Sequence, residues 1–547
     1  MLNTRFVLRG LPTVLLVMMS LPAAAQSFRV QCPTSTITHP STVAGVNNNA
    51  EPTYTGPTTL VSTVSGETTP VNGYLVPSAN VNGAIKCQQI SGGDGYATMG
   101  DGTQTYMFSF GPLSGIVDIA NGKPGTQFPN LFNTTFTGVV APGDPDTTGL
   151  GTFTYNGAIG QVPDLDNGSA IDGHVDPRQI MDVGVMNGNS PAPMMAIDED
   201  DEFFLTLTNV GMIMRPDLFE QHTVHFHGYP NASSFYDGVP DASVAINIGA
   251  SFTYYYLAPD AGTYFWHCHI TPPEHLQMGM VGQIYVRPRQ NRVAGGASLY
   301  AALLAQQGDL RTACNSTSDI LCSNPLPPAN NGAARDPKLN TTVAVGTSAP
   351  PLTYAVNYAY NDGDGTTAYD VEYPIQIHGF DPNFHFVGMT FNPEGFVDMK
   401  DKYFLLNGRS YPDTVTTGPL QTQSADGVNH FSQPLPTIVN IPAGKKALLR
   451  ISDLDVTEYQ TLASLGIPMH VIGYNAKLLR DQAGVNLYYD TNSITLAGGE
   501  SLDVILDASD TTKYPQGSVF YLYTPNLDHL SNDAENFGGL MTEVHII

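Results

Sequence analysis

Six of the fourteen histidines lie in two short clusters, and a cysteine stands inside the second cluster. The first cluster reads His222-Thr-Val-His225-Phe-His227-Gly. The second reads His267-Cys268-His269-Ile-Thr-Pro-Pro-Glu-His275, and Met278 and Met280 follow it. Imidazole, thiolate and thioether groups are nitrogen and sulfur ligands of transition metals. Each residue alone would more often be an ordinary core residue, but together they favour metal binding.

The spacing divides these side chains between two faces of a strand. Successive side chains on a strand point to opposite faces, so His225 and His227 share one face while His222 points to the other. In the second cluster the same alternation turns Cys268 away from the histidine on either side of it. His275 and Met280 come from the loop beyond the strand and can fold back toward Cys268.

Two candidate metal sites follow from this alternation. The first, called the sulfur site below, comprises His222, Cys268, His275 and Met280. The second, called the histidine cluster, comprises His225, His227, His267 and His269.

The sulfur site has the ligand set of a copper centre. Two imidazoles, a thiolate and a distant thioether suit copper in electron transfer, because soft sulfur stabilises Cu(I) and nitrogen supports Cu(II). Zinc prefers a closed tetrahedral site without a weak methionine ligand. Met280 lies five residues after His275, so we choose it over Met278 as the axial ligand.

The elements that must position these residues are mainly strands. Runs rich in β-branched and aromatic residues, bounded by turn signals, predict strands at 106–110, 203–207, 252–256 and 283–286. The pattern around His225-Phe226-His227-Gly228-Tyr229 recurs as His470-Val471-Ile472-Gly473-Tyr474, which indicates two copies of one sandwich. We therefore predict an all-β protein with domains at 101–290 and 345–547, joined by a short helix and a linker over 291–344.

The N-terminal region is predicted to precede these domains. Arg5 and Arg9 come before an apolar run over 11–21 and small residues at 23–25, which is typical of a secretory signal peptide over 1–25. We therefore expect a periplasmic or secreted protein. Residues 26–100 are rich in Ser, Thr, Gly, Asn and Pro, and we expect an irregular segment there. A long insertion is expected over about 120–180.

The cysteine count fits an oxidising compartment. There are five cysteines, so one is left over when the others pair. Cys268 is assigned to the metal, and Cys32 is paired with Cys87 and Cys314 with Cys322, although four cysteines permit three pairings.

The formal net charge of −27 excludes nucleic acid and anionic membrane surfaces as partners. Outside the signal peptide no run of about 20 apolar residues predicts a membrane span. A negative field would favour cationic substrates such as metal ions, although a need for solubility explains the same charge.

The segment 221–286 resembles the copper-binding motifs of multicopper oxidases and of their relatives, the copper nitrite reductases. Those oxidases carry a His-x-x-His-x-His-Gly motif and a His-Cys-His-Ile motif, then a His and a Met or Leu five residues apart. This chain has all three features, with two more residues than usual between Cys268 and His275. The resemblance implies two cupredoxin-like Greek-key β-sandwich domains with long insertions.

The resemblance also implies roles for the two sites. The sulfur site would hold type 1 copper, His225 would serve type 2 copper, and His227, His267 and His269 would serve a type 3 pair.

Two acidic residues are candidate functional groups. Asp237 resembles the acid that assists proton delivery in the family, although an Asp before Gly is also an ordinary turn residue. Glu274 lies beside His275 and could bind a cationic donor such as Mn(II), Fe(II) or Cu(I); a solvated loop glutamate is the simpler interpretation.

The second domain departs from the family pattern. A complete trinuclear cluster takes eight histidines in four His-x-His pairs, and this chain supplies two pairs. The position that matches His227 is Ile472, and the strand that matches residues 267–269 reads Tyr523-Thr524-Pro525. Five histidines of the second domain are weak candidates because they lack the paired spacing: His378, His385, His470, His529 and His545. A homo-oligomer or a partner chain would have to complete the cluster, unless the site holds fewer coppers.

These features predict a copper-dependent oxidase. It would take single electrons from a small reductant, either a metal ion or a phenol, near His275 and deliver them through Cys268 to dioxygen. Two alternatives stay open: a nitrite reductase-like enzyme, and a non-enzymatic type 1 copper protein that carries electrons or holds copper.

Overall fold

The computed structural model describes residues 33–112, 161–164, 170–175, 188–306, 333–335, 339–342, 352–355 and 357–547, with gaps of one to six residues inside the longer ranges. The expected signal peptide, most of the expected 120–180 insertion and three of the paired cysteines lie outside these residues. Cys87 is buried and disulfide-bonded, and its pairing with Cys32 remains a prediction.

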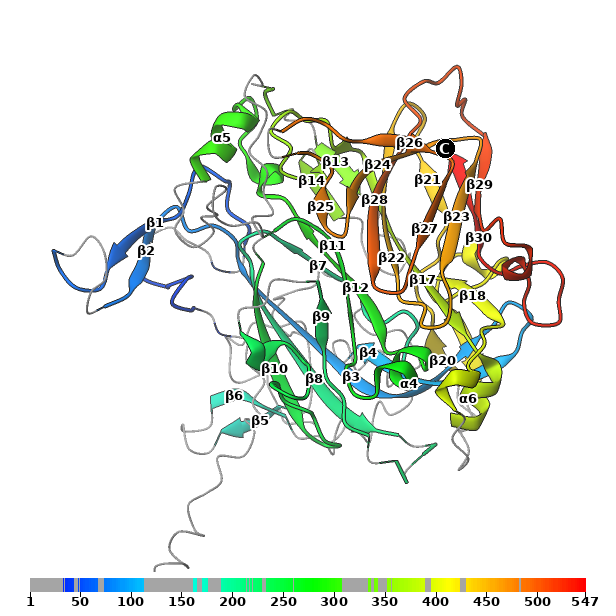
Figure 1. Cartoon of the computed structure of the whole chain (residues 1–547). Helices are drawn as coiled ribbons and strands as arrows, with labels where there is room; N and C mark the ends of the chain where they lie inside the picture. The colour runs from blue at the N-terminus through cyan, green and yellow to red at the C-terminus, as the bar shows by residue number, and fades with distance from the viewer. Residues whose placement is uncertain are drawn as a thin grey trace, which may run out of the picture.

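Two four-stranded sheets form the first sandwich, drawn in blue to green in Figure 1. One sheet has the order β10 (Ser251–Leu257), β8 (Glu202–Gly211), β3 (Ile85–Thr98) and β4 (Gln104–Pro112). The other has the order β7 (Met195–Asp198), β12 (Val281–Arg287), β11 (Gly262–His267) and β9 (His225–His227).

Alternation along the strands builds the core between these sheets. Phe203, Leu205 and Leu207 of β8 point inward, and they join Trp266 of β11 and Phe226 of β9 in one buried cluster. Burying an aromatic or large aliphatic side chain contributes about 1.5–3 kcal/mol, so this cluster fixes the register of β9 and β11.

The second sandwich, yellow to red in Figure 1, has a seven-stranded and a five-stranded sheet. The seven-stranded sheet runs β18 (Tyr403–Leu406), β17 (Val371–Phe380), β22 (Lys446–Asp453), β28 (Glu500–Asp507), β24 (Met469–Tyr474) and β25 (Lys477–Leu478), with β26 (Tyr489–Thr491) also on β24. The five-stranded sheet runs β21 (Val439–Ile441), β30 (Met541–Ile546), β29 (Val519–Tyr523), β23 (Gln460–Leu465) and β27 (Ser493–Leu496).

Short elements connect and flank the sandwiches. The α-helices are α4 (Pro272–Gln277), α5 (Leu299–Gln306) and α6 (Pro382–Gly388). The 3-10 helices are η3 (Ser234–Tyr236), η4 (Arg289–Arg292), η5 (Phe396–Asp398), η6 (Asp413–Val415) and η7 (Leu527–Leu530). Five strand pairs complete the description: β1 (Thr59–Ser62) with β2 (Leu75–Ala79), β5 (Gln161–Asp164) with β6 (Ala170–Val175), β13 (Leu339–Thr342) with β14 (Leu352–Ala355), β15 (Asn357–Tyr358) with β16 (Ala368–Tyr369), and β19 (Leu420–Gln423) with β20 (Asn429–Ser432).

The two sandwiches pack face to face through β11 and β12 of the first and β17, β22 and β28 of the second. Residues of β12 that point away from their own core meet buried charged groups: Arg287 lies 3.0 Å from Glu372, and Glu372 lies 3.1 Å from Arg450. Gln283 donates to the Arg450 carbonyl at 2.9 Å. Because these buried groups pair with one another across the interface, the contact is specific as well as extensive.

The all-β class is confirmed, and strands occupy all four of the ranges 106–110, 203–207, 252–256 and 283–286. The structure corrects the expected irregular segment over 26–100, because β3 runs from Ile85 to Thr98 and lies inside a sheet. Its three glycines and its polar residues favour a loop, but neighbouring strands on both sides supply its hydrogen bonds. The predicted domain boundaries otherwise stay predictions.

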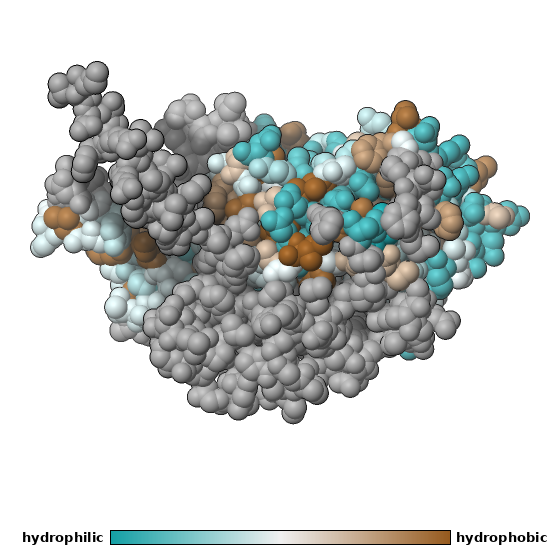
Figure 2. All heavy atoms as spheres, turned by 90° about the horizontal axis from the view of Figure 1, so that it is seen from below, coloured by the Kyte–Doolittle hydropathy of each residue, from teal (hydrophilic) through white to brown (hydrophobic). Residues whose placement is uncertain are grey.

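Over the described part of the face in Figure 2, hydrophilic residues predominate, with a small hydrophobic group near its middle. Isolated exposed apolar residues are ordinary on a protein surface. None of the helices in the described ranges combines the length and apolar character needed to cross a membrane.

Candidate metal centre

The pairing of β9 with β11 places the histidine pairs. His225 lies opposite His267, and Phe226 lies opposite Trp266. Since Phe226 and Trp266 enter the core, His225 and His267 must point to the other face of the sheet. Cys268 directly follows β11 and is part of the core cluster, so it lies on the core side as predicted.

His222, Cys268 and His275 come together in the sulfur site. One ligand atom from each lies within 4.8 Å of the other two, and all three residues are fully buried. The His275 Nδ1 lies 3.2 Å from the Cys268 Sγ. Neither ring nitrogen of His222 has a hydrogen-bond partner among the described residues. A buried imidazole without partners is costly, and a bound metal ion would satisfy it.

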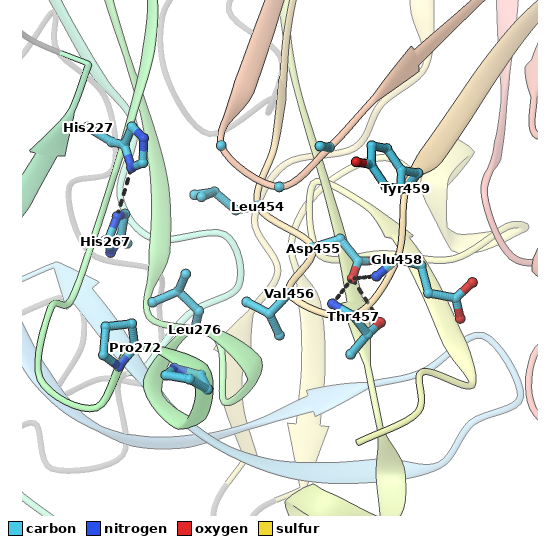
Figure 3. Close-up of a pocket in the computed structure, with 14 residues that line it drawn as sticks. His227, His267, Pro272, Leu276, Leu454, Asp455, Val456, Thr457, Glu458 and Tyr459 are labelled. Carbon is cyan, nitrogen blue, oxygen red and sulfur yellow. Dashed lines mark hydrogen bonds between the residues drawn. The ribbon is translucent and has the colours of Figure 1, made fainter. Parts of the chain in front are cut away.

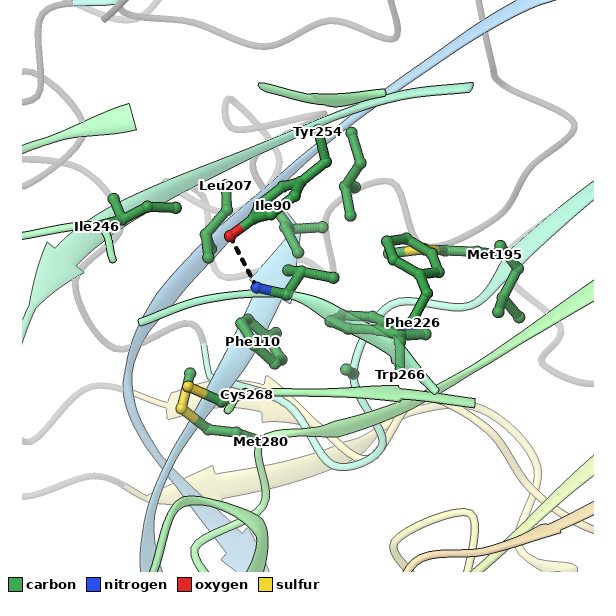
Figure 4. Packing of buried hydrophobic residues seen from close by; sticks show 14 of the residues in the cluster. Ile90, Phe110, Met195, Leu207, Phe226, Ile246, Tyr254, Trp266, Cys268 and Met280 are labelled. Carbon is green, nitrogen blue, oxygen red and sulfur yellow. Dashed lines mark hydrogen bonds between the residues drawn. The ribbon is translucent and has the colours of Figure 1, made fainter. Parts of the chain in front are cut away.

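Neighbouring residues shape the space around these ligands. A Cβ at Gly92 of β3 would stand 2.6 Å from the His222 Cδ2, so only glycine leaves room for the ring. The Phe108 ring packs edge-on against His275 at 5.1 Å between centroids. The Cys268 amide donates to the Met280 carbonyl at 3.2 Å, and Figure 4 shows both side chains at one end of the core cluster. Met280 is thus a neighbour of Cys268, as the sequence predicted.

His275 lies on α4, whereas the sequence predicted a loop there. Two prolines begin this helix, which is a favourable position because the first helical N–H groups have no partner in the helix. The turn directs the His275 ring back toward Cys268.

Opposite charges hold the sulfur site together in the metal-free protein. Burial alone would raise the pKa of Cys268, but His275 and His222 outweigh it and lower that pKa well below its usual range. Burial alone would lower the pKa of His275, but the Cys268 thiolate and Glu220 raise that pKa to about 10. A thiolate is the form that binds metal, and metal binding would displace the proton of His275.

Three members of the histidine cluster meet on the opposite face of β9 and β11. One ligand atom each of His225, His227 and His267 lies within 4.8 Å of the others. The His227 Nδ1 lies 3.2 Å from the His267 Nε2. His269 joins through ring contacts, with centroids 5.1 Å from His225 and 5.7 Å from His267.

Burial and neighbouring imidazoles keep His227 and His267 in the neutral form that binds metal ions. Burial, and then the neighbouring imidazoles, lower the pKa of His227 to about 4. Burial likewise lowers the pKa of His267 to about 3, against a hydrogen bond to the Cys268 carbonyl. Both rings are therefore neutral at pH 7, and their lone pairs can coordinate a cation.

A cavity of about 470 Å³ opens beside the histidine cluster, between the two sandwiches (Figure 3). His227, His267 and Leu276 line it from the first sandwich. The opposite wall comes from the second sandwich and contains no histidine among the described residues: Leu454, Asp455, Val456, Thr457, Glu458, Tyr459, Ala497, Gly498 and Gly499. A Cβ at Gly499 would stand 3.7 Å from the His227 ring.

The other histidines of the second sandwich lie away from this wall or serve its structure. His470 hydrogen-bonds to Asp490 across the pair of β24 and β26, and His545 hydrogen-bonds to Glu543. His529 stacks on Phe404 at 3.9 Å. The position corresponding to His227 is Ile472, which belongs to an apolar cluster between the sandwiches. His378 and His385 are buried near the α4 helix.

The predicted acids lie next to the two sites. The Asp237 carbonyl accepts from the His225 Nδ1 at 2.7 Å, and its carboxylate lies 3.5 Å from the same nitrogen. Glu274 is on α4 beside His275, and burial raises its pKa. Sequence reasoning missed Glu220, whose carboxylate lies 3.4 Å from the His275 Nε2. Its position two residues before His222 was the available signal, but a single acid in a predicted loop carries no distinctive pattern.

A further acidic group was also missed: Glu51, Asp198 and Asp201 lie within 4.8 Å of one another. Lys86 compensates this charge, with its Nζ 2.9 Å from Glu51 and 3.7 Å from Asp201. The group is therefore a buried ion-pair network that links the N-terminal segment to the first sandwich.

Residues 171–291 match the family model described as Multicopper oxidase, and both candidate sites lie inside that range. Laccase abr2 of Aspergillus fumigatus is 34% identical over 109 residues, which cover 20% of this chain and 17% of that protein. The copper-containing nitrite reductase of Rhizobium meliloti is 33% identical over 114 residues, covering 20% of this chain and 27% of that protein. The similarity thus spans less than a third of either relative.

Among solved structures, the Blue Copper Oxidase from Nitrosomonas europaea aligns with a TM-score of 0.45 and 16% identity, over 84% of this chain and 86% of that one.

Proposed function

We propose that this chain is an exported copper-dependent oxidase that couples one-electron oxidation of a donor to reduction of dioxygen, because residues 171–291 match the family model described as Multicopper oxidase. The observation that carries the proposal is the placement of two ligand sets on opposite sides of one strand end. Cys268 belongs to the sulfur site, and its covalent neighbour His267 belongs to the histidine cluster. The two sites are therefore linked through a few bonds of one backbone.

The residues fit copper. His222, Cys268, His275 and Met280 would hold type 1 copper, and His225, His227, His267 and His269 would hold the second site. Bound copper supplies one-electron redox chemistry at both places. The donor set supports this, because it combines soft sulfur with imidazole and includes a buried His222 ring whose nitrogens have no hydrogen-bond partner among the described residues.

The chain's own residues exclude water, orient the ligands and hold a proton. Phe108 and the core cluster cover the sulfur site, which is fully buried. The Asp237 carbonyl accepts a hydrogen bond from the His225 Nδ1. This contact keeps the proton on Nδ1, so the Nε2 lone pair is free to bind a metal. The Asp237 carboxylate lies 3.5 Å from the same nitrogen and would hold and transfer protons beside the His225 ring.

Copper stoichiometry tests the proposal. We expect about four coppers per functional unit, an intense visible thiolate-to-copper band and a near-ultraviolet band from a coupled pair. The count is read beside the mass in solution, since a second copy or a partner chain would have to supply the histidines that the described cavity wall lacks.

Cys268→Ser should abolish the intense visible band, because a hydroxyl group cannot replace the thiolate. Met278→Leu is the matched control: Met278 is buried in the same core cluster but is not assigned as a ligand, so its loss should leave the band. Persistence of the band in Cys268→Ser would contradict the copper assignment.

A second candidate is reduction of a small oxyanion at one copper held by part of the histidine cluster. The cavity wall without described histidines favours it, since a full trinuclear site has no second set of ligands in this part of the chain. About two coppers per chain, with nitrite consumption and little oxygen uptake, would support it. One copper with only the visible band would instead support an electron carrier.

Glu274 is proposed to bind a cationic donor beside His275, together with Glu220. Glu274→Gln should then raise the KM for Fe(II) or Mn(II) several-fold, because it removes one of two negative charges, and leave the KM for a phenol unchanged. Asp528→Asn, on the exposed η7 of the second sandwich, is the charge-matched control. Equal effects of both variants, or none from Glu274→Gln, would contradict this role.

A further inference from the structure

The side chain of Gln277 joins the segment that carries His275 and Met280 to the second sandwich by hydrogen bonds. Gln277 ends α4, between His275 and Met280, and it is fully buried. Its Nε2 donates to the Asp401 Oδ1 at 2.9 Å, and its Oε1 accepts from the Asp381 amide at 2.8 Å. Both the amide nitrogen and the amide oxygen of the Gln277 side chain are thus hydrogen-bonded to residues more than a hundred positions away in sequence.

A third contact holds the main chain at the same point. The His385 Nε2 lies 2.9 Å from the Gln277 carbonyl oxygen, and its Nδ1 lies 2.5 Å from the carbonyl oxygen of Tyr106 on β4. Burial lowers the pKa of His385 to about 4, so the neutral ring donates to one of these two carbonyls at a time. His385 therefore bridges the end of α4 and a strand of the first sandwich.

The second-sandwich residues are themselves fixed. The Asp381 carboxylate accepts from the amides of Asn383 and Phe384 at the start of α6, and from the Lys400 amide. The Asp401 carboxyl group also accepts from the Thr457 hydroxyl. Groups with several partners cannot shift without breaking other bonds, so they are a rigid anchor.

We infer that Gln277 is a positioning residue through which the second sandwich sets the place of His275 and Met280 over Cys268. This inference rests on the proposed copper role of the sulfur site, but its geometric part concerns the metal-free chain. The second sandwich would then serve the metal site by fixing the ligand loop, whether or not it contributes ligands of its own.

Accessibility of the Cys268 thiol in metal-free protein tests the geometric part. His275, on α4, lies against the Cys268 Sγ, so freeing the end of α4 should expose the thiol. Gln277→Leu keeps the size of the side chain and removes both hydrogen bonds. Alkylation at Cys268, followed by peptide mass spectrometry, should become about 10-fold faster or more, because local opening becomes easier when a buried side chain loses its partners.

Gln283→Leu is the matched control. Gln283 is also a fully buried glutamine of the first sandwich, and it donates to the Arg450 carbonyl and the Ser452 hydroxyl across the same interface. Its loss should cost similar stability but leave Cys268 protected. Asp401→Asn, which keeps an oxygen acceptor for Gln277, should stay near the parent, whereas Asp401→Leu should behave like Gln277→Leu.

The copper-loaded protein gives a second measurement. Gln277→Leu should change the energy of the visible band and the copper hyperfine splitting in electron paramagnetic resonance, and Gln283→Leu should change neither. Unchanged labelling in Gln277→Leu, or equally fast labelling in Gln283→Leu, would overturn the inference. If the parent shows no visible band with copper, the proposed function fails while the labelling comparison still decides the positioning role.

Discussion

Gly92 shows how one missing side chain makes the sulfur site possible. It lies on β3, where the pairing with β8 shifts register just after it, and the His222 ring occupies the space where a Cβ would be. The sequence offered no reason to connect Gly92 with His222, because the two are 130 positions apart. The proposed ligands could be predicted from their spacing in the sequence, but the space that Gly92 leaves for the His222 ring could not.

Gly92→Ala should displace the His222 ring, because its Cβ would stand 2.6 Å from the His222 Cδ2. Displacing a ligand through a neighbour typically costs about 10–100-fold in metal affinity. Competitive titration with a copper chelator measures the loss.

Gly95→Ala is the control on the same strand, since its Cβ would clash with the Gly188 backbone instead. It should lower stability and leave copper affinity unchanged. If the two variants weaken copper binding equally, Gly92 has no specific role at the site.

Buried charged residues lie between the sheet of the first sandwich that contains β12 and the sheet of the second sandwich that contains β17 and β22. Glu372 of β17 lies between Arg287 of β12 and Arg450 of β22. Burial alone would raise the pKa of Glu372, but the two guanidinium groups outweigh it and lower that pKa to about 2. The carboxylate is therefore charged in the folded protein over the whole ordinary pH range.

Glu372→Gln should lower the free energy of unfolding by about 3–5 kcal/mol at pH 7, because it removes the buried carboxylate that both guanidinium groups share, although Arg450 also lies 3.6 Å from Asp503. Asp507→Asn removes the partly exposed partner of Lys446 on the same sheet and should cost at most about 1 kcal/mol. Urea unfolding of the three proteins measures these differences.

The effect of Glu372 should also depend on pH. Its folded pKa lies below the unfolded value of 4.5, so its stabilisation is present above that pH and is lost as the pH falls toward about 2. The gap between parent and Glu372→Gln should narrow over this window. A gap that stays constant down to about pH 2.5 would argue against the ion pair as its cause.

Strand alternation made much of the architecture predictable for the whole molecule. The runs at 203–207 and 252–256 became neighbouring strands, and the opposite faces of Cys268 and His267 followed from their adjacency. The sequence did not predict β3, because its glycines and polar residues show no apolar alternation, and its neighbouring strands hold it in the sheet. Local sequence cannot show such support.

The relation between the sandwiches was harder to anticipate. The repeat of the His225 region at His470 indicated a second sandwich in which Ile472 replaces the matching histidine, but it did not show that Ile472 packs into an apolar cluster between the sandwiches. Gln277 and Glu220 each look ordinary in sequence, and they gain importance only from partners that the fold brings near. The sequence was therefore least informative about contacts between segments that are far apart along the chain.

The buried charges on the outer face of β12 have a practical consequence for truncation. A fragment that ended after η4 would keep every proposed ligand, yet Arg287 and Gln283 would lose their partners in the second sandwich. The face of β12 that the second sandwich covers in the full chain would become exposed to solvent, and such surfaces favour aggregation. Expression of the ligand-bearing half alone would call for redesign of that face rather than a simple stop codon.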